Sequence, residues 1–264
     1  MDRLHDERGE CRTGRMAEVA SVQFHFGEEA PLVGTGGSGT IFFTHCNLAC
    51  TFCQNHEISH GGQGRPMSPT QLAQAMVGLQ DAGAHNVNLV SPSHVVPHIL
   101  EALLVAAEAG LRIPLVYNSG GYDSLPTLRL LDGVVDIYMP DAKYGDTDAG
   151  ERYSGVPSYP DVNRAAIREM YRQVGDLQVD GQGIARKGLL VRHLVLPGGI
   201  AGTRAVMRFL AQEISPKTYV NVMDQYRPCH RACEDELLAR PLRWSEYRHA
   251  LQVAEEEGIE NRGD

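Results

Sequence analysis

The chain has 264 residues, 42% of them hydrophobic and 22% charged, which is the composition of a folded protein with a full core in one or two domains. A formal net charge of −9 argues against a nucleic-acid partner, because neutralising phosphates needs clustered Lys and Arg. No run approaches about 20 apolar residues, and the first eight residues lack a signal-peptide core, so no membrane segment is predicted and a cytoplasmic location is expected.

The first part of the chain is predicted to be a polar extension, residues 1–33, ahead of a core domain at 34–264. Within the extension, alternating apolar residues at 19–26 predict one short strand. The glycine-rich run at 34–39 precedes a strand and contains no Lys, so it is interpreted as a turn and not as a phosphate-binding loop. The start of this extension is expected to be truncated, unless the region that would precede it is dispensable.

The core domain alternates between predicted strands and helices. The predicted strands are residues 40–43, 86–90, 113–117, 134–139, 189–196 and 218–223. The predicted helices are about 69–83, 94–110, 125–131, 161–174, 202–214 and 245–257. Six β/α units in succession predict parallel strands, right-handed crossovers and an incomplete version of the eightfold α/β barrel.

Three of the six cysteines form a C-x3-C-x2-C array, Cys46, Cys50 and Cys53, directly after the first strand of the core. Thiolates grouped this closely are typical metal ligands, and a reducing compartment keeps them free. Three cysteines are one short of a closed four-cysteine zinc or iron–sulfur site. The array therefore predicts a metal centre with one coordination position open to another ligand.

Polar residues and glycines follow the predicted strands, on the rim where α/β barrels place their active sites. The candidate binding residues on this rim are Ser91, Ser93, Asn118, Ser119, Asp141, Lys143, Arg192 and Gln225.

The cysteine array, with aromatic Phe52 just before its last cysteine, resembles the signature of the radical S-adenosylmethionine enzymes. Residues 37–43, 50–55 and 223–228 resemble the branch related to pyruvate formate-lyase activating enzymes, and within it the uncharacterised homologues of those activases. The resemblance spans the chain from about residue 20 to its end.

This resemblance implies a partial (β/α)6 TIM-like barrel with a [4Fe–4S] cluster on Cys46, Cys50 and Cys53 and S-adenosylmethionine on the fourth iron. One electron, from a flavodoxin- or ferredoxin-type donor, would cleave the cofactor to methionine and a 5′-deoxyadenosyl radical that abstracts hydrogen. The hydrogen would come from a glycine of a partner protein, as for glycyl-radical activases, or from a small molecule.

The resemblance also implies roles for rim residues. Phe52 would pack near the adenine. The family's Gly-Gly-Glu after the second strand, whose Glu contacts the methionine amine, is replaced here, so Ser91, Ser93 or the backbone would make that contact. The activases' Asp-Thr-Asn-Gly run is present as residues 117–120, with Tyr117 at the Asp position, and no cation is predicted there.

Asp141, Lys143 and Arg192 match an Asp-x-Lys motif and an Arg of the family. They could engage the carboxylate and ribose of the cofactor or a substrate group, because Lys and Arg donors suit anionic partners.

Two other functions are compatible with the cysteine array. A structural zinc site could use the three cysteines with His45, His56 or His60 as the fourth ligand. A cluster could instead transfer electrons only.

The remaining cysteines, Cys11, Cys229 and Cys233, could bind a second metal. Cysteine spacing without a full ligand set is weak evidence, so incidental thiols are the favoured interpretation.

Overall fold

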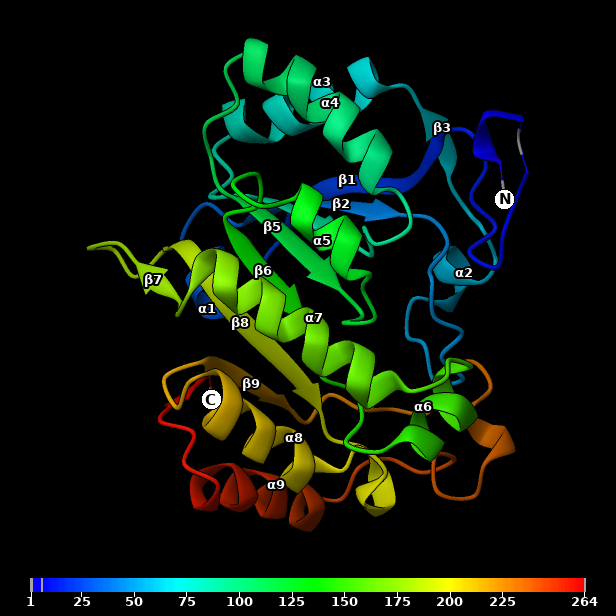
Figure 1. Cartoon of the computed structure of the whole chain (residues 1–264), viewed down its shortest axis with the longest axis vertical. Helices are drawn as coiled ribbons and strands as arrows, with labels where there is room; N and C mark the ends of the chain where they lie inside the picture. Colours follow the sequence, from blue (N-terminus) through cyan, green and yellow to red (C-terminus); the bar gives the residue numbers. More distant parts are fainter. Residues whose placement is uncertain (1, 6, 264) are drawn as a thin grey trace.

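Six parallel strands form the centre of the molecule. The computed structural model describes residues 2–5 and 7–263. The strands, in the order in which they lie side by side, are β2 (Ser38–Phe43), β4 (Val87–Val90), β5 (Leu115–Ser119), β6 (Ile137–Pro140), β8 (Ala185–Leu194) and β9 (Tyr219–Met223). Figure 1 shows the curved sheet that they build, with a helix in each crossover.

The two edges of the sheet carry different short strands. β1 (Ala17–His25) pairs antiparallel with β2, and β3 (Arg65–Met67) pairs antiparallel with β1. At the other edge, β10 (Asn261–Arg262) runs parallel to β9. Within the described ranges β3 and β10 do not pair with each other, so the barrel stays open, as the partial (β/α)6 prediction requires.

The helices of the repeating units lie at the predicted positions. They are α3 (Pro69–Asp81), α4 (Val96–Glu108), α5 (Leu125–Leu130), α7 (Tyr159–Val174), α8 (Thr203–Phe209), which continues as the π-helix η3 (Leu210–Ile214), and α9 (Trp244–Glu256). None of the described helices has the length and apolarity to cross a bilayer.

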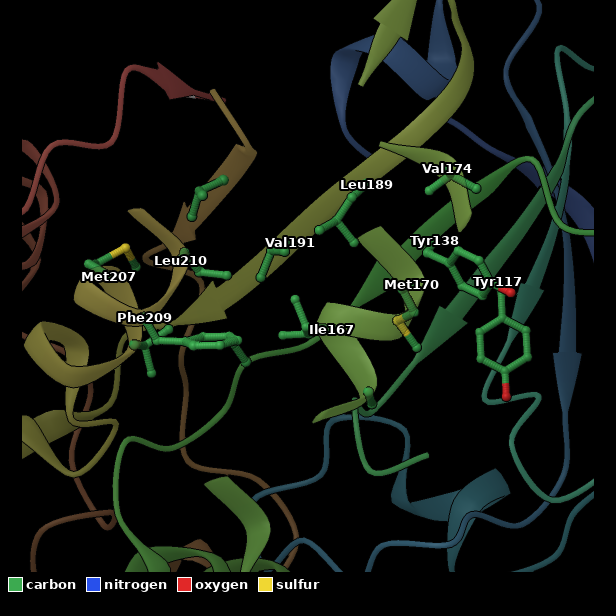
Figure 2. Packing of buried hydrophobic residues seen from close by; sticks show 14 of the residues in the cluster. Tyr117, Tyr138, Ile167, Met170, Val174, Leu189, Val191, Met207, Phe209 and Leu210 are labelled. Atoms are coloured by element: carbon green, nitrogen blue, oxygen red, sulfur yellow. The ribbon is translucent and has the colours of Figure 1, made fainter. Parts of the chain in front are cut away.

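The main core lies between the sheet and its outer helices. In Figure 2, Ile167 and Met170 of α7 pack against Leu189 and Val191 of β8, and Tyr138 of β6 closes the same layer. Each such buried side chain contributes about 1.5–3 kcal/mol through the apolar surface that it removes from water. This layer fixes α7 to the strands whose ends carry the polar rim.

The inside of the barrel is filled below that rim by α1 (Ala30–Val33). Its Leu32 is fully buried against Val116, Met139 and Leu190 of three different strands. Because α1 fills the barrel interior at the amino-terminal ends of the strands, the open space lies at their carboxyl ends.

The structure corrects several predicted details. α1, α2 (His56–Ser59) and α6 (Thr147–Ser154) were not predicted. α7 begins at Tyr159, two residues before the predicted start at 161. Pro160 in the first turn favours this start, because the N–H that proline lacks would have no helical partner there. Four short elements, η1 (Arg3–His5), β7 (Gln178–Val179), η2 (Pro197–Gly199) and η4 (Ala232–Glu234), complete the described chain.

Candidate active site

A cavity of about 220 Å³ opens at the carboxyl ends of the parallel strands. All of the site residues predicted from the sequence line it except Ser93, which lines a different cavity together with Arg3 and His94. The predicted residues in the cavity wall are Cys46, Cys50, Phe52, Cys53, Ser91, Asn118, Ser119, Asp141, Lys143, Arg192 and Gln225. The strand order therefore brings together side chains that are up to 179 positions apart in the sequence.

The cysteine loop that follows β2 is held from outside by α6. Ala49 N donates to Ser154 O at 2.9 Å, and Thr51 N donates to Tyr153 O at 2.9 Å. On its other side, Thr51 O accepts from Arg231 N at 2.8 Å. Backbone bonds of this kind fix the loop in one conformation, so the cysteines are positioned before any ligand binds.

Each cysteine sulfur in the array has a close polar partner. The contacts are Leu48 N to Cys46 Sγ at 3.4 Å, Ser154 Oγ to Cys50 Sγ at 3.0 Å, and Ser59 Oγ to Cys53 Sγ at 3.1 Å. Donors aimed at sulfur stabilise thiolates and are a common way of tuning a metal centre.

Burial raises the pKa of the Cys46 thiol to about 12 and also raises the pKa of Cys50. Since the thiolate is the ligand, the charge of a bound metal must drive deprotonation here. Among residues 2–5 and 7–263, no three His, Cys, Asp or Glu side chains converge to ligate a single ion. Three thiols around one cavity suit a cubane cluster, because each thiolate binds a different iron and the sulfurs need not meet at one point.

The histidines considered as zinc ligands make other contacts. His45 is buried, with Nε2 3.6 Å from a carboxylate oxygen of Glu18. The rings of His56 and His60 lie 5.0 and 4.7 Å from the ring of His230.

The opposite part of the cavity carries a cluster of charged side chains. Lys143 Nζ donates to Asp141 Oδ2 at 2.5 Å, and Arg192 Nε donates to Asp141 Oδ1 at 2.9 Å. Arg192 Nη2 also donates to Asn118 Oδ1 at 2.6 Å. Burial alone would raise the pKa of Asp141, but Arg192 and Lys143 outweigh it and lower that pKa. Asp141 thus lies between two cations, whose remaining N–H groups can bind an anionic group.

Glu28 stands behind Arg192 and was not found from the sequence. Its Oε2 lies 3.8 Å from Arg192 Nη1, and its side chain is 8% exposed. Burial raises the pKa of Glu28 to about 7, against the opposing effect of Arg192; the neighbouring carboxylates of Glu29 and Asp141 reinforce the rise. No spacing or motif marked Glu28, because its contact with β8 depends on how α1 enters the barrel.

Replacing Glu28 by Gln should make the protein more stable at pH 8, by roughly 3 kcal/mol. A carboxyl group with a raised folded-state pKa binds more protons when folded, so wild-type stability falls as pH rises from 4.5 to about 7. Urea unfolding across this pH range should show a smaller fall for Glu28→Gln, whereas Glu255→Gln, at an exposed position, should follow the wild type. Identical profiles for Glu28→Gln and wild type would rule out the raised pKa.

Tyr159 of α7 ties together the ends of β5 and β6. Its hydroxyl oxygen accepts from Lys143 N at 3.1 Å, and its proton is shared between Gly120 O at 2.8 Å and Asp141 O at 3.0 Å. Asn163 Nδ2 reaches the same Asp141 O at 2.9 Å. These two α7 residues position the backbone of the charged cluster.

Tyr159→Phe should therefore lower the free energy of unfolding by about 1–2 kcal/mol, because the N–H of Lys143 and the carbonyl of Gly120 lose their partner, while Asp141 O keeps Asn163. The matched control is Tyr171→Phe on the same helix, whose hydroxyl makes no hydrogen bond within the described chain. Chemical denaturation measures both; equal losses would show that the bridge has no special role.

Three of the predicted residues in the cavity wall also make contacts within the protein. Ser119 Oγ donates to Asp123 Oδ2 at 2.6 Å, and Asp123 also accepts from the Tyr117 hydroxyl at 2.9 Å. The Ser119 hydroxyl is thus bonded to Asp123. Gln225 lies at the cavity mouth, where its carbonyl oxygen accepts from Gln54 Nε2 at 3.1 Å.

Phe52 packs edge-on against Tyr226, with ring centroids 6.0 Å apart. Both rings belong to the apolar cluster beneath the cysteine loop.

No protein-family model matches the chain. The chain is 33% identical over 262 residues to the uncharacterized protein MJ0674 of Methanocaldococcus jannaschii, a match that covers 96% of this chain and 71% of that protein. The chain belongs to the same family as that archaeal protein.

Solved structures of radical S-adenosylmethionine enzymes share the fold. anSMEcpe with bound AdoMet and the Cp18Cys peptide matches with a TM-score of 0.55 and 10% identity, over 81% of this chain and 56% of that one. Methylornithine synthase (PylB) matches with a TM-score of 0.53 and 17% identity, over 81% of this chain and 60% of that one. Streptococcus suis SuiB bound to precursor peptide SuiA matches with a TM-score of 0.53 and 13% identity, over 83% of this chain and 46% of that one. The chain thus spans about half the length of the structures that it matches and has the radical S-adenosylmethionine fold.

Proposed function

We propose that this chain is a radical S-adenosylmethionine enzyme related to the pyruvate formate-lyase activating enzymes. The observation that carries the proposal is the cavity itself, where the three thiols of a C-x3-C-x2-C array share one space with the cationic cluster around Asp141. The shared fold and the open coordination position expected from three cysteines support the same conclusion.

In this proposal Cys46, Cys50 and Cys53 hold a [4Fe–4S] cluster. When bound, the cluster and S-adenosylmethionine together supply reductive cleavage of a carbon–sulfur bond and hydrogen abstraction. The chain's residues bind and orient: Lys143 and Arg192 offer N–H donors to an anionic carboxylate, and Asn118 and Ser91 offer polar groups beside them. Phe52 provides apolar surface against the adenine. Phe42, Phe43 and Leu48 help to exclude water from the reacting atoms.

The class of enzyme is tested by anaerobic reconstitution of the purified chain with iron and sulfide. The expected product is brown and contains about four irons and four sulfides per chain. A colourless protein that takes up one zinc ion instead would overturn the proposal in favour of the structural zinc site. Among the residues that the structure describes, no three His, Cys, Asp or Glu side chains converge on a single ion, which supports the iron–sulfur alternative.

We further propose that the substrate is a glycine in an exposed loop of a partner protein, with a flavodoxin or ferredoxin as electron donor. The resemblance of residues 37–43, 50–55 and 223–228 to the activase branch supports this, as do matching structures that contain a bound peptide. Pyruvate formate-lyase serves as the probe: a glycyl radical in its electron paramagnetic resonance spectrum supports the activase function. Cofactor cleavage that instead depends on an added small-molecule fraction would favour the small-molecule alternative.

A further inference from the structure

Two buried hydroxyl groups form a chain behind the sulfur of Cys50. Ser154 Oγ lies 3.0 Å from Cys50 Sγ, and the Tyr144 hydroxyl lies 2.8 Å from Ser154 Oγ. Ser154 is fully buried, Tyr144 is 1% exposed and Cys50 is 8% exposed. Neither hydroxyl lines the cavity, so the pair faces the sulfur from the protein side, away from the space for a ligand.

The position of this pair is fixed by the backbone. Ser154 is the last residue of α6, and its carbonyl accepts from Ala49 N in the cysteine loop at 2.9 Å. Tyr144 is held by an edge-on contact with Tyr159, with ring centroids 5.2 Å apart. The distance from hydroxyl to sulfur is therefore set by two elements that meet at Cys50, and not by a mobile side chain.

Metal ligation determines the direction of both hydrogen bonds. A thiolate has no proton and can only accept, so Ser154 must donate to Cys50. Ser154 Oγ can then only accept from Tyr144, whose phenolic group keeps its proton at neutral pH. The two bonds point the same way, and such chains strengthen each other in a low-dielectric interior.

We propose that the Tyr144–Ser154 hydroxyl pair raises the reduction potential of the iron–sulfur centre held by Cys50, and this inference rests on the proposed function. The reduced centre carries one more negative charge than the oxidised centre. A donor aimed at its sulfur therefore stabilises the reduced state more, and a weaker reductant suffices. Ser154 and Tyr144 are positioning residues in this account, acting through Cys50.

The experiment is a potentiometric titration of the reconstituted full chain, followed by electron paramagnetic resonance. Ser154→Ala should make one-electron reduction about tenfold less favourable, which lowers the midpoint potential by about 59 mV. Tyr144→Phe keeps the ring and the serine, so it should lower the potential by a smaller amount. The control is Tyr153→Phe, also on α6, whose hydroxyl faces Asp235 at 3.3 Å; its potential should match the wild type.

The outcomes separate the inference from the proposed function. A wild-type chain that assembles no iron–sulfur centre removes the proposed function and the inference together. A wild-type centre whose potential is the same in Ser154→Ala overturns the inference alone. If Ser154→Ala does not retain the centre, Tyr144→Phe decides, because an unchanged potential there excludes the relay.

Discussion

Cys50→Ala should lose the iron–sulfur centre, with iron falling from about four per chain to background after reconstitution. The sulfur of Cys50 is buried and positioned by the bonds from Ala49 and Thr51 to α6, so no other side chain can take its place without moving that loop. Iron and sulfide analysis, together with the visible absorption band, measures the loss. In this variant Ser154 Oγ keeps its hydrogen bond to the Tyr144 hydroxyl, so it is not left without a partner and the chain should remain folded.

Cys233→Ser is the matched control for this variant, because Cys233 is an exposed free thiol in η4, which follows β9. It should retain full iron content. Equal iron in Cys50→Ala and the wild type would contradict the assignment of the cysteine array as the ligand set.

Arg192→Ala should lower the free energy of unfolding by about 3 kcal/mol, because it leaves Asp141 and Glu28 close to each other without their shared cation. This loss is at the lower end of the range for a broken buried ion pair, since the side chain of Arg192 is 18% exposed. We also expect the Kd of the reconstituted chain for S-adenosylmethionine to rise about tenfold. Urea unfolding and calorimetric titration measure the two effects.

Arg192→Lys separates charge from geometry at the same position. A lysine restores the positive charge but lacks the planar fork that bonds Asp141 and Asn118 together, so both effects should be intermediate. If Arg192→Ala were as stable as the wild type, the cluster around Asp141 would not contribute to holding β6 and β8 together.

The repeating part of the fold was predictable because its signals are local. A capping box starts α3, for example: Gln71 N donates to Ser68 Oγ at 3.2 Å, and Ser68 N donates to Gln71 Oε1 at 2.9 Å. α6 was missed although Asp146 caps its start and Gly155, with φ of 67°, ends it. This helix has only eight residues, most of them polar, so its sequence shows no helical repeat of apolar residues.

The wall of the candidate site was predictable to the extent that it follows strand ends. Asp141 and Arg192 could be placed on one rim in advance, because they follow or lie on parallel strands whose carboxyl ends share an edge; their ion pair is seen only in the structure. Glu28, Tyr159 and Ser154 could not be found this way. Each reaches the site from a segment outside the strand ends, and the sequence carries no spacing that encodes such a contact.

The most direct test of the account is the formation of 5′-deoxyadenosine. The reconstituted chain is incubated anaerobically with S-adenosylmethionine and dithionite, and the products are separated by chromatography. The account predicts 5′-deoxyadenosine and methionine in equal amounts from the wild type, with none above background from Cys50→Ala. A wild-type chain that carries the cluster and binds S-adenosylmethionine but leaves it intact would contradict the account and favour electron transfer alone.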